Sequence, residues 1–588
     1  MTLFDHLVIA FYFAFMVAVG VVFRRFVTDV SDYFRSGGKV LWWMVGSSAF
    51  MVSFSAWTFT GAVSKAYADG WPVMTIYVAN AVGFLLDALY FAPRFRQLRV
   101  ITAVEAIRLR FGTVSEQVFT WLQIPLGVLN AGIWLNAIGV FFAAVFGIDP
   151  RLTIVVTGLV VLLIALSGGS WAVLASDFMQ ALILMVVCAA VLAHTLARIG
   201  GPAAFAAVVP PGHLDLGQVF TRDFLGLWCL AMLVKQIHTT NNLYDAVRYL
   251  CVKDSRHARW AGWLGAALFL VGIALWFLPP MIARTLLPEL GTRFPQLAHP
   301  EEAAYIAIAR EVLPVGMMGL LASAIFAATM SSMDSGLNKN AGVFVKNFYQ
   351  PWLRPQATDA HLLRVGKLAT LAMGVLIVAT ALEMNELRGL GLFRLMQRVG
   401  ILIGVPVVVP LFLGLLVKRT PPWSAWSTVL IGFASSLVFS RLLTPDWAVR
   451  TFGLEGVLDS AEREYWTQSA QFFANLLTAG TWFLLTRLFW PQTSGADRAR
   501  IEGFFQRMHT PVDFEREEGP TAARDREQSL AVGWLAVAYG TFIVLLAAIP
   551  NPPAGRLTFL ASGAVVAAIG GWLIRAAPRP PANDGERA

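Results

Sequence analysis

The stretch that decides the fold reads Phe326-Ala-Ala-Thr-Met-Ser331-Ser332-Met-Asp334-Ser335, and it lies inside a long apolar run. Two adjacent hydroxyls stand where a helix buried in a membrane normally carries Leu or Val. Hydroxyls and unpaired carbonyls at membrane depth are costly unless they bind something, and oxygen ligands of this kind suit a small cation such as sodium. The alternative is that Ser and Thr bond back to their own helix or join neighbouring helices.

Two further polar interruptions lie upstream. Ser53-Phe-Ser55-Ala-Trp-Thr58-Phe-Thr60-Gly61 interrupts the apolar segment 41–67, and Lys235-Gln236-Ile-His238-Thr239-Thr240-Asn241-Asn242 interrupts the segment 222–247. If 41–200 and 201–421 each form a five-helix repeat, each repeat begins with an interrupted helix. Such helices at matching places of two halves indicate a binding site near the membrane midplane of an inverted-repeat transporter. The two halves share no visible sequence identity, so this prediction depends on hydropathy and on the position of the breaks.

The composition excludes an ordinary soluble domain, because the mean hydropathy is +0.64 and only 14% of the residues are charged. The formal charge of +9 is scattered over short loops, which is typical of topology signals, and we expect no nucleic-acid partner. No phosphate-binding loop, metal-ligand cluster or nucleophile elbow is present, so we expect no enzyme. The three cysteines lie in or beside apolar runs, which argues against a disulfide framework.

Fifteen apolar segments are long enough to be membrane spans, or fourteen if the short segment 152–167 is excluded. They are 5–24, 41–67, 71–93, 117–147, 152–167, 177–199, 222–247, 258–285, 313–345, 362–384, 390–417, 422–442, 467–488, 529–549 and 556–575. The first is predicted to be an anchor rather than a signal peptide, since Arg24-Arg25 follows it and no basic region precedes it.

Alternate loops differ in basic content, and this difference predicts the orientation. The loops that carry Arg24-Arg25, the arginines of 94–110, Lys418-Arg419 and the segment 491–528 should be cytoplasmic, whereas 66–71, 147–151, 383–389 and 550–556 are poor in Lys and Arg. The protein is therefore expected to be a multi-pass protein of the inner (plasma) membrane with its N-terminus outside and its C-terminus in the cytoplasm.

The predicted organisation has six parts. They are an N-terminal helix and cytoplasmic loop at 1–40, two five-helix repeats at 41–200 and 201–421, peripheral helices at 422–490, a cytoplasmic loop with a short amphipathic helix (Ile501–Met508) at 491–528, and C-terminal helices with a tail at 529–588.

Four motifs in order resemble the sodium/solute symporter family, whose members include bacterial sodium/galactose, sodium/proline and sodium/sialic acid transporters. They are Asp32-Tyr-Phe-Arg-Ser-Gly37-Gly38, Gly168-Gly169-Ser-Trp-Ala-Val-Leu-Ala-Ser176-Asp177-Phe-Met-Gln180, Ala327-Ala-Thr-Met-Ser331-Ser332-Met-Asp334-Ser335 and Leu411-Phe-Leu-Gly-Leu-Leu-Val-Lys418-Arg419. The resemblance covers 32–419. It implies an all-α polytopic protein with a LeuT-type core of five plus five inverted-repeat helices, one extra N-terminal helix and about four extra C-terminal helices.

The resemblance also implies the positions that bind the co-transported sodium. They are the carbonyl groups of Met51, Phe54 and Ala328, the hydroxyls of Ser331 and Ser332, and Asp177 on the inner sodium route, which could instead be a solvated helix N-cap. Two departures from the family pattern are present. Some proline transporters have Asp where Ser53 stands, and members that bind a second sodium carry a hydroxyl where Ala328 stands, so a single sodium is expected.

For the solute, the resemblance implies Trp57, Thr58, Tyr77, Asn80, Asn130, Lys235, His238 and Gln397. Lys235 lies too deep in its span for its ammonium group to reach the interface, so the charge must meet a cavity, a counter-ion or a substrate. The alternative to a solute is an ion pair with Asp87 or Asp245. For Asn80 and Asn130 it is hydrogen bonding between helices.

We therefore predict a sodium-coupled symporter that imports a small organic solute by alternating access, as a monomer or weak homo-oligomer in the lipid bilayer. A carboxylate-bearing solute is favoured because of Lys235. The alternatives are a sodium/sugar or polyol symporter and a transporter-like solute sensor, which would need an output domain that the sequence does not display. A channel is disfavoured, because paired breaks suit occlusion better than an open pore.

Overall fold

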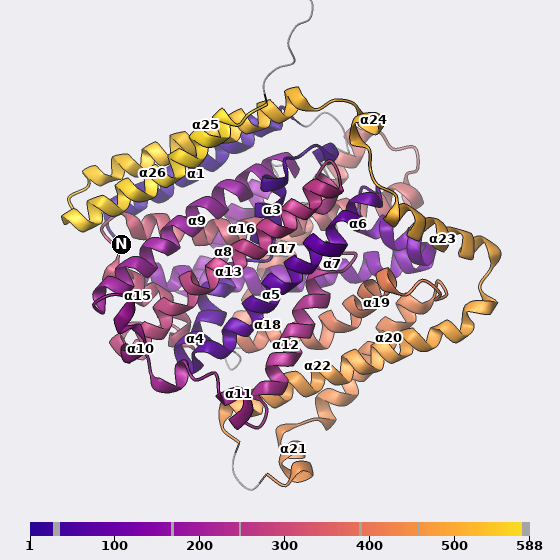
Figure 1. Cartoon of the computed structure of the whole chain (residues 1–588), viewed down its shortest axis with the longest axis horizontal. Coiled ribbons are helices and arrows are strands. Elements are labelled where there is room, and N and C mark those ends of the chain that lie inside the picture. Colours follow the sequence, from indigo (N-terminus) through magenta and orange to yellow (C-terminus); the bar gives the residue numbers. More distant parts are fainter. Residues whose placement is uncertain (27–35, 166–169, 246–247, 387–390, 455–457, 579–588) are drawn as a thin grey trace, which may run out of the picture.

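The computed structural model describes residues 1–26, 36–165, 170–245, 248–386, 391–454 and 458–578. Over these residues the chain is a bundle of helices (Figure 1), and the only β-pairing is an isolated parallel bridge between Val40 and Val252. The all-α prediction is confirmed. Part of the first motif, 32–35, and Gly168-Gly169 of the second lie outside the described residues.

The long helices are α1 (Leu3–Arg24), α7 (Ala103–Phe146), α9 (Ser170–Arg198), α13 (Ser255–Leu286), α16 (Met317–Val343), α17 (Asp359–Glu386), α20 (Ser424–Leu442), α22 (Ser460–Leu485), α25 (Ala522–Leu545) and α26 (Pro553–Arg575). The shorter ones are α3 (Trp42–Val52), α4 (Val63–Asp69), α5 (Met74–Leu86), α6 (Ala92–Gln97), α8 (Pro150–Ala165), α10 (Phe205–Val208), α11 (Gln218–Thr221), α12 (Leu225–Thr240), α14 (Leu290–Arg293), α15 (Ala304–Val312), α18 (Leu392–Val399), α19 (Val405–Leu416), α21 (Pro445–Phe452), α23 (Gly495–His509) and α24 (Phe514–Glu518).

Twelve helices of the described chain are long and apolar enough to cross a membrane. The three other predicted segments correspond to shorter or broken helices: α3 with α4, α8, and α12. The helices differ from the predicted ranges mainly at their ends. α7, for example, begins at Ala103 rather than near 117, and Gly112 interrupts its helical geometry with φ 84°.

The first predicted interruption is a real break in helical structure, whereas the second coincides with the end of a helix, since α12 runs unbroken through Lys235 to Thr240. α3 ends at Val52, and the chain resumes through a π-helical turn, Thr58–Ala62, into α4. α12 ends at Thr240, where the Asn241 side chain turns back to donate to the Ile237 carbonyl at 2.8 Å. A third irregularity, the π-helical turn Gly400–Gly404, separates α18 from α19. Where the regular helix stops, backbone groups inside the bundle meet polar side chains, as the Phe54 carbonyl meets the Ser332 hydroxyl at 2.7 Å.

The charged segment 491–528 holds two helices, α23 and α24, rather than the one short helix predicted at 501–508. The amphipathic character of α23 is confirmed, because Ile501, Phe504 and Met508 are buried. The segment is joined to other loops by ion pairs, Lys418 with Glu502 at 2.6 Å and Arg99 with Glu517 at 2.7 Å. The Arg99 hydrogen bonds lower the pKa of the Glu517 carboxyl.

The last two helices, α25 and α26, form an antiparallel hairpin that lies along α1 (Figure 1). Glycines let the two backbones meet. A Cβ on Gly540 would lie 2.5 Å from the Ala567 nitrogen, and one on Gly570 would lie 2.6 Å from the Gly533 carbonyl oxygen. Small residues at such contacts allow close helix packing in a membrane, where dispersion rather than hydrophobic exclusion holds helices together.

Replacing Gly540 with alanine should destabilise the protein, because the added methyl group overlaps the α26 backbone. Overpacking of this kind costs about 1–3 kcal/mol. We expect a lower melting temperature and a lower yield of folded protein in detergent. Gly571→Ala is the matched control, since nothing lies within 4 Å of a Cβ at that position. Equal melting temperatures for the two variants would contradict close packing at Gly540.

Candidate functional site

The first helix break and α16 bring several backbone oxygens to one point. The Ser332 hydroxyl oxygen lies 2.7 Å from the Phe54 carbonyl oxygen and 3.3 Å from those of Met51, Val52 and Ala328. One hydroxyl can donate a single hydrogen bond, so four carbonyl groups converge there with more acceptor capacity than this donor can use. Carbonyl groups freed by an unwound helix are the ligands that transporters of this architecture use for sodium.

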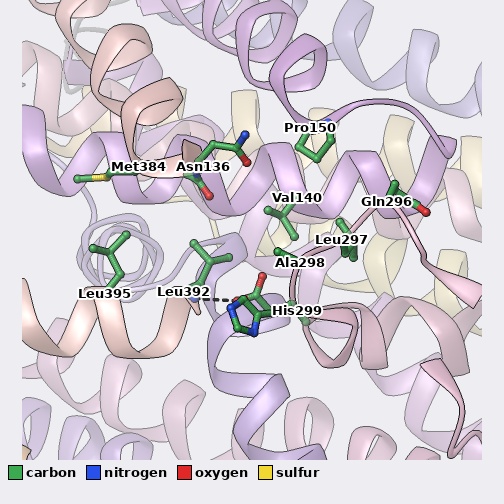
Figure 2. Close-up of a pocket in the computed structure, with 12 residues that line it drawn as sticks. Asn136, Val140, Pro150, Gln296, Leu297, Ala298, His299, Met384, Leu392 and Leu395 are labelled. Carbon is green, nitrogen blue, oxygen red and sulfur yellow. Dashed lines mark hydrogen bonds between the residues drawn. The ribbon is translucent and has the colours of Figure 1, made fainter. Parts of the chain in front are cut away.

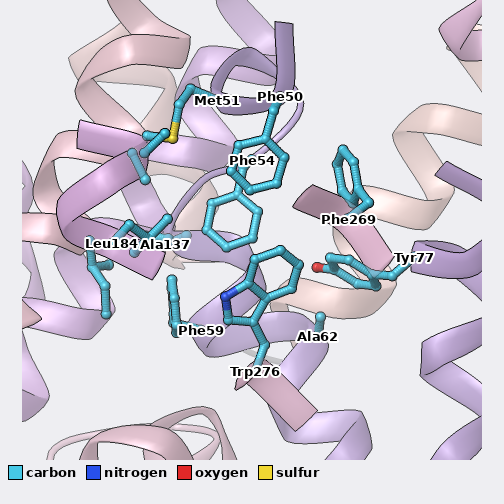
Figure 3. Close-up of a cluster of buried hydrophobic side chains, with 14 of the residues drawn as sticks. Phe50, Met51, Phe54, Phe59, Ala62, Tyr77, Ala137, Leu184, Phe269 and Trp276 are labelled. Carbon is cyan, nitrogen blue, oxygen red and sulfur yellow. The ribbon is translucent and has the colours of Figure 1, made fainter. Parts of the chain in front are cut away.

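The break is fixed by a second α16 hydroxyl and by an aromatic cluster. The Ala56 backbone N–H donates to the Thr329 hydroxyl at 2.9 Å, so α16 holds both sides of the break. Beside it, Phe54 packs on Trp276 with a centroid distance of 4.3 Å, and Phe50 stacks on Phe54 at 5.4 Å (Figure 3). These aromatic side chains pack against one side of the break, while Ser53 at the break itself is exposed.

Ser331 and Asp177 lie buried near this cluster. Asp177 Oδ2 accepts a hydrogen bond from the Ser48 hydroxyl, Asp177 Oδ1 accepts none among the described residues, and the Ser331 hydroxyl lies close enough to the Asp177 carboxylate to interact with it. The N-cap interpretation of Asp177 is wrong, because α9 begins at least seven residues earlier, at Ser170. The sequence suggested a cap because Ser176-Asp177 precedes an apolar run; helix boundaries are the least certain part of such a prediction.

α12 carries the Lys235 side chain to α18. Lys235 Nζ donates to Gln397 Oε1 at 2.6 Å, and Lys235 is 8% exposed. The ion pair considered from the sequence is wrong for both candidates. Asp87 accepts from the Tyr249 hydroxyl at 3.0 Å, and Asp245 accepts from the Asn242 amide at 2.7 Å. Lys235 forms no ion pair with any carboxylate of the described residues.

Other predicted solute positions form separate contacts around this pair. The Tyr77 hydroxyl donates to the Thr58 hydroxyl at 2.8 Å, and Asn80 Oδ1 accepts from Gln236 Nε2 at 2.8 Å. The His238 ring stacks on Phe472 at 5.8 Å, and its Nδ1 donates to the Val234 carbonyl rather than to a neighbouring helix. The Trp57 indole N–H donates to the Leu392 carbonyl at 3.1 Å.

The structure therefore joins Lys235 with Gln397 and Tyr77 with Thr58, whereas no hydrogen bond within the described chain links Asn130 to the others. Sequence reasoning missed Gln236, which bonds Asn80, and Trp276, which covers Phe54. Gln236 follows Lys235 directly, so the polar run itself could have indicated it. No motif in the sequence around Trp276 indicates its contact with Phe54.

Comparison with known proteins settles the family. The family model described as "Sodium:solute symporter family" matches residues 33–432. The chain belongs to this family. Among curated relatives, sodium/myo-inositol cotransporter 2 of Sus scrofa is 26% identical over 487 residues, which cover 74% of this chain and 69% of that protein. The sodium/glucose cotransporter of Vibrio parahaemolyticus is 26% identical over 470 residues, 75% of this chain and 84% of that one.

A solved structure supports the fold. A Na+-coupled sialic acid symporter in a substrate-bound, outward-open state superposes with a TM-score of 0.64 and 18% identity, over 84% of this chain and 98% of that one. The LeuT-type fold and the sodium-coupled symporter class are thus confirmed, and so is the expectation that the family is one of transporters rather than enzymes. Sodium is the co-transported ion. The five-plus-five division and the domain limits stay predictions.

In this symporter, Asp177→Asn should slow turnover about tenfold while leaving the protein assembled, since an amide keeps the Ser48 hydrogen bond and loses only the negative charge, which is expected to attract sodium. The initial rate of sodium-driven uptake and the sodium concentration for half-maximal rate would be measured together. Ser48→Ala is the control, because it removes the hydrogen bond and keeps the charge. A normal rate and sodium affinity in Asp177→Asn would show that the carboxylate is structural only.

The symporter also contains a small cavity next to α18 (Figure 2). It lies between α7, the loop 296–299 and the first turns of α18, and its volume is about 50 Å³. Small-molecule sites usually measure about 300–1,000 Å³, so this cavity is not the solute site. Glu302, one of its lining residues, accepts a hydrogen bond from the Leu392 N–H at 2.7 Å. Burial raises the pKa of the Glu302 carboxyl to about 7.

Proposed function

We propose that this symporter uses the inward movement of sodium to import a small organic solute that bears a carboxylate. Sodium would bind between the Met51, Phe54 and Ala328 carbonyl groups and the Ser331 and Ser332 hydroxyls. Asp177 would then guide its release inward. The solute would bind at Lys235 and Gln397, with the remaining predicted pocket residues around it.

A carboxylate on the solute is supported by the surroundings of the Lys235 side chain. Its ammonium group is buried, contacts an amide oxygen at 2.6 Å and has no carboxylate partner in the described chain. A buried cation left with a neutral partner carries a desolvation cost that an anionic ligand would offset. A charged side chain buried at membrane depth usually marks a functional site.

A neutral sugar or polyol is the second candidate. Curated relatives are named as sodium/myo-inositol and sodium/glucose cotransporters, and Gln397, Gln236 and Asn80 offer amide groups that suit hydroxyls. The relatives are 26% identical, so their solutes are a guide to chemistry rather than to identity.

Uptake into proteoliposomes, with and without an inward sodium gradient, separates the two candidates. Glucose and glucuronate form a matched pair that differs in one carboxylate, and myo-inositol and pyruvate extend the panel in each direction. We expect the sodium gradient to drive uptake of the two acids, glucuronate and pyruvate. Sodium-driven uptake of glucose or myo-inositol, with every acid ignored, would establish the second candidate instead.

We further propose that the protein lies in the inner membrane with its N-terminus outside and its C-terminus in the cytoplasm, as a monomer or weak homo-oligomer. The basic residues of 94–110 and 491–528 support this orientation. Cysteines placed singly in the segments 550–556 and 491–528 would test it. If a cysteine in 491–528 reacts with an impermeant maleimide on intact cells, the orientation is the reverse of the one proposed.

A further inference from the structure

The first turn of α18 is held by three side chains from distant segments. Leu392 donates its N–H to Glu302 at 2.7 Å and accepts the Trp57 indole N–H at 3.1 Å. Arg394 donates to Glu464 at 3.3 Å. Glu464 also accepts from Lys65 at 2.7 Å, so α4 and α22 share this contact.

Glu302 acts as the cap of α18 from outside the helix. Gly391, which precedes the helix, offers no side-chain cap, and the Glu302 carboxyl takes that place from the turn Pro300–Ala303, ninety residues earlier. A carboxylate at this end also suits the helix dipole. Burial raises the pKa of the Glu302 carboxyl, and either protonation state can accept the Leu392 N–H.

α18 also carries one half of the proposed solute site and ends at an irregular turn. Its Gln397 binds Lys235, and the π-helical turn Gly400–Gly404 follows. A Cβ on Gly400 would lie 3.2 Å from Lys235 Nζ, so this turn borders the same ammonium group. π-Helical segments inside helices are frequent at functional sites. The turn therefore divides α18 from α19 next to the proposed solute-binding pair.

We propose that Glu302 is a positioning residue that keeps α18 closed over the solute site, and that α18 opens by bending at Gly400–Gly404 when this hydrogen bond is released. The inference rests on the proposed solute site for its role in transport. The Trp57 and Glu464 contacts remain when Glu302 is replaced, so the helix should loosen at its first turn without unfolding.

A cysteine at position 395 reports the opening of α18. Leu395 is 9% exposed and lines the small cavity, so its replacement is shielded while α18 is closed. The native cysteines, Cys188, Cys229 and Cys251, would first be replaced by alanine. The rate of alkylation by N-ethylmaleimide would then be measured on the purified, sodium-free protein. This readout needs no solute, so it can fail or succeed independently of the solute assignment.

Glu302→Ala should raise the alkylation rate about tenfold. Removing a helix cap costs about 1 kcal/mol or slightly more, which corresponds to a tenfold larger open population. Glu302→Gln should leave the rate near that of the parent, because the amide oxygen still accepts the Leu392 N–H. Glu301→Ala, on the same turn, is the matched control. Unchanged alkylation in folded Glu302→Ala, or an equal rise in Glu302→Gln, would overturn the proposal.

Leu392→Pro removes the donor of this hydrogen bond, and proline is favoured at the first position of a helix; because it also removes the buried Leu392 side chain, Leu392→Ala, which keeps the N–H, is its control. It should raise the alkylation rate as Glu302→Ala does, with Glu302 still present. If Glu302→Ala fails to fold, Leu392→Pro decides alone: a parent-like rate would overturn the proposal. A higher half-saturating solute concentration with unchanged sodium dependence would link the opening to the solute site.

Discussion

Replacing Ser331 and Ser332 together with alanine should raise the sodium concentration for half-maximal uptake about ten- to hundredfold. The Ser332 hydroxyl oxygen lies within 3.3 Å of four backbone carbonyl oxygens, so it occupies the centre of the proposed cage. A hydrogen bond or ligand contact to a charged group contributes about 1.5–3 kcal/mol, which corresponds to that range in affinity. Sodium-dependent uptake into proteoliposomes, at saturating solute, gives the measurement.

Ser323→Ala is the matched control for this variant. Ser323 lies on the same helix, is 2% exposed and has no hydrogen-bond partner within the described chain, so its removal deletes a buried hydroxyl outside the cage. Ser332→Thr, which keeps a hydroxyl, should change the sodium dependence far less than alanine. An unchanged sodium dependence in a well-folded double variant would move the sodium site elsewhere.

Replacing Lys235 with glutamine should weaken uptake of the carboxylate solute about thirtyfold or more while the protein still folds. Removing one partner of a buried charge pair costs about 2–5 kcal/mol, and here the partner is supplied by the solute. Folding should survive, because no carboxylate of the described chain is left unpaired by the change. Half-saturating concentrations for an acid and for its neutral analogue, in the same vesicles, provide the measurement.

Gln397→Glu tests the same idea from the other side. A glutamate there would place a carboxylate where Lys235 now meets an amide oxygen at 2.6 Å, and so build the ion pair within the protein. Acid uptake should fall as in Lys235→Gln, and melting should occur at a higher temperature rather than a lower one. Undiminished acid uptake in both variants would exclude Lys235 from solute recognition.

The sequence predicted the local features of the site well. The break after Val52 follows from hydroxyls inside an apolar run, and the segment 51–54 and α16 were matched by motif before their oxygens were known to meet. The adjacency Ser331-Ser332 pointed to the turn of α16 at which Ser332 meets the backbone carbonyl groups of the first break. Each of these signals is contained within about ten neighbouring residues, which is the range over which hydropathy and turn chemistry act.

Contacts between distant segments were not predictable in this way. The depth of Lys235 follows from the sequence, but the only partners within the chain that the sequence suggests for it are Asp87 and Asp245, and the structure supplies Gln397, 162 residues away. The Glu302 cap on α18 joins segments ninety residues apart. Hydropathy places such residues at a depth but not on facing sides of neighbouring helices, so only the packed bundle pairs them.

The C-terminal hairpin has a consequence for the order in which the molecule is made. Phe11 of α1 stacks on Phe542 of α25 at 3.5 Å, and Phe15 meets Tyr539 at 4.7 Å. Synthesis proceeds from the N-terminus, so the first helix enters the membrane long before the helix that covers it exists. Every transport helix is translated in between. The earliest part of the chain is thus the last to be completed, and a ribosome that stops before α25 leaves a defect at the opposite end of the sequence.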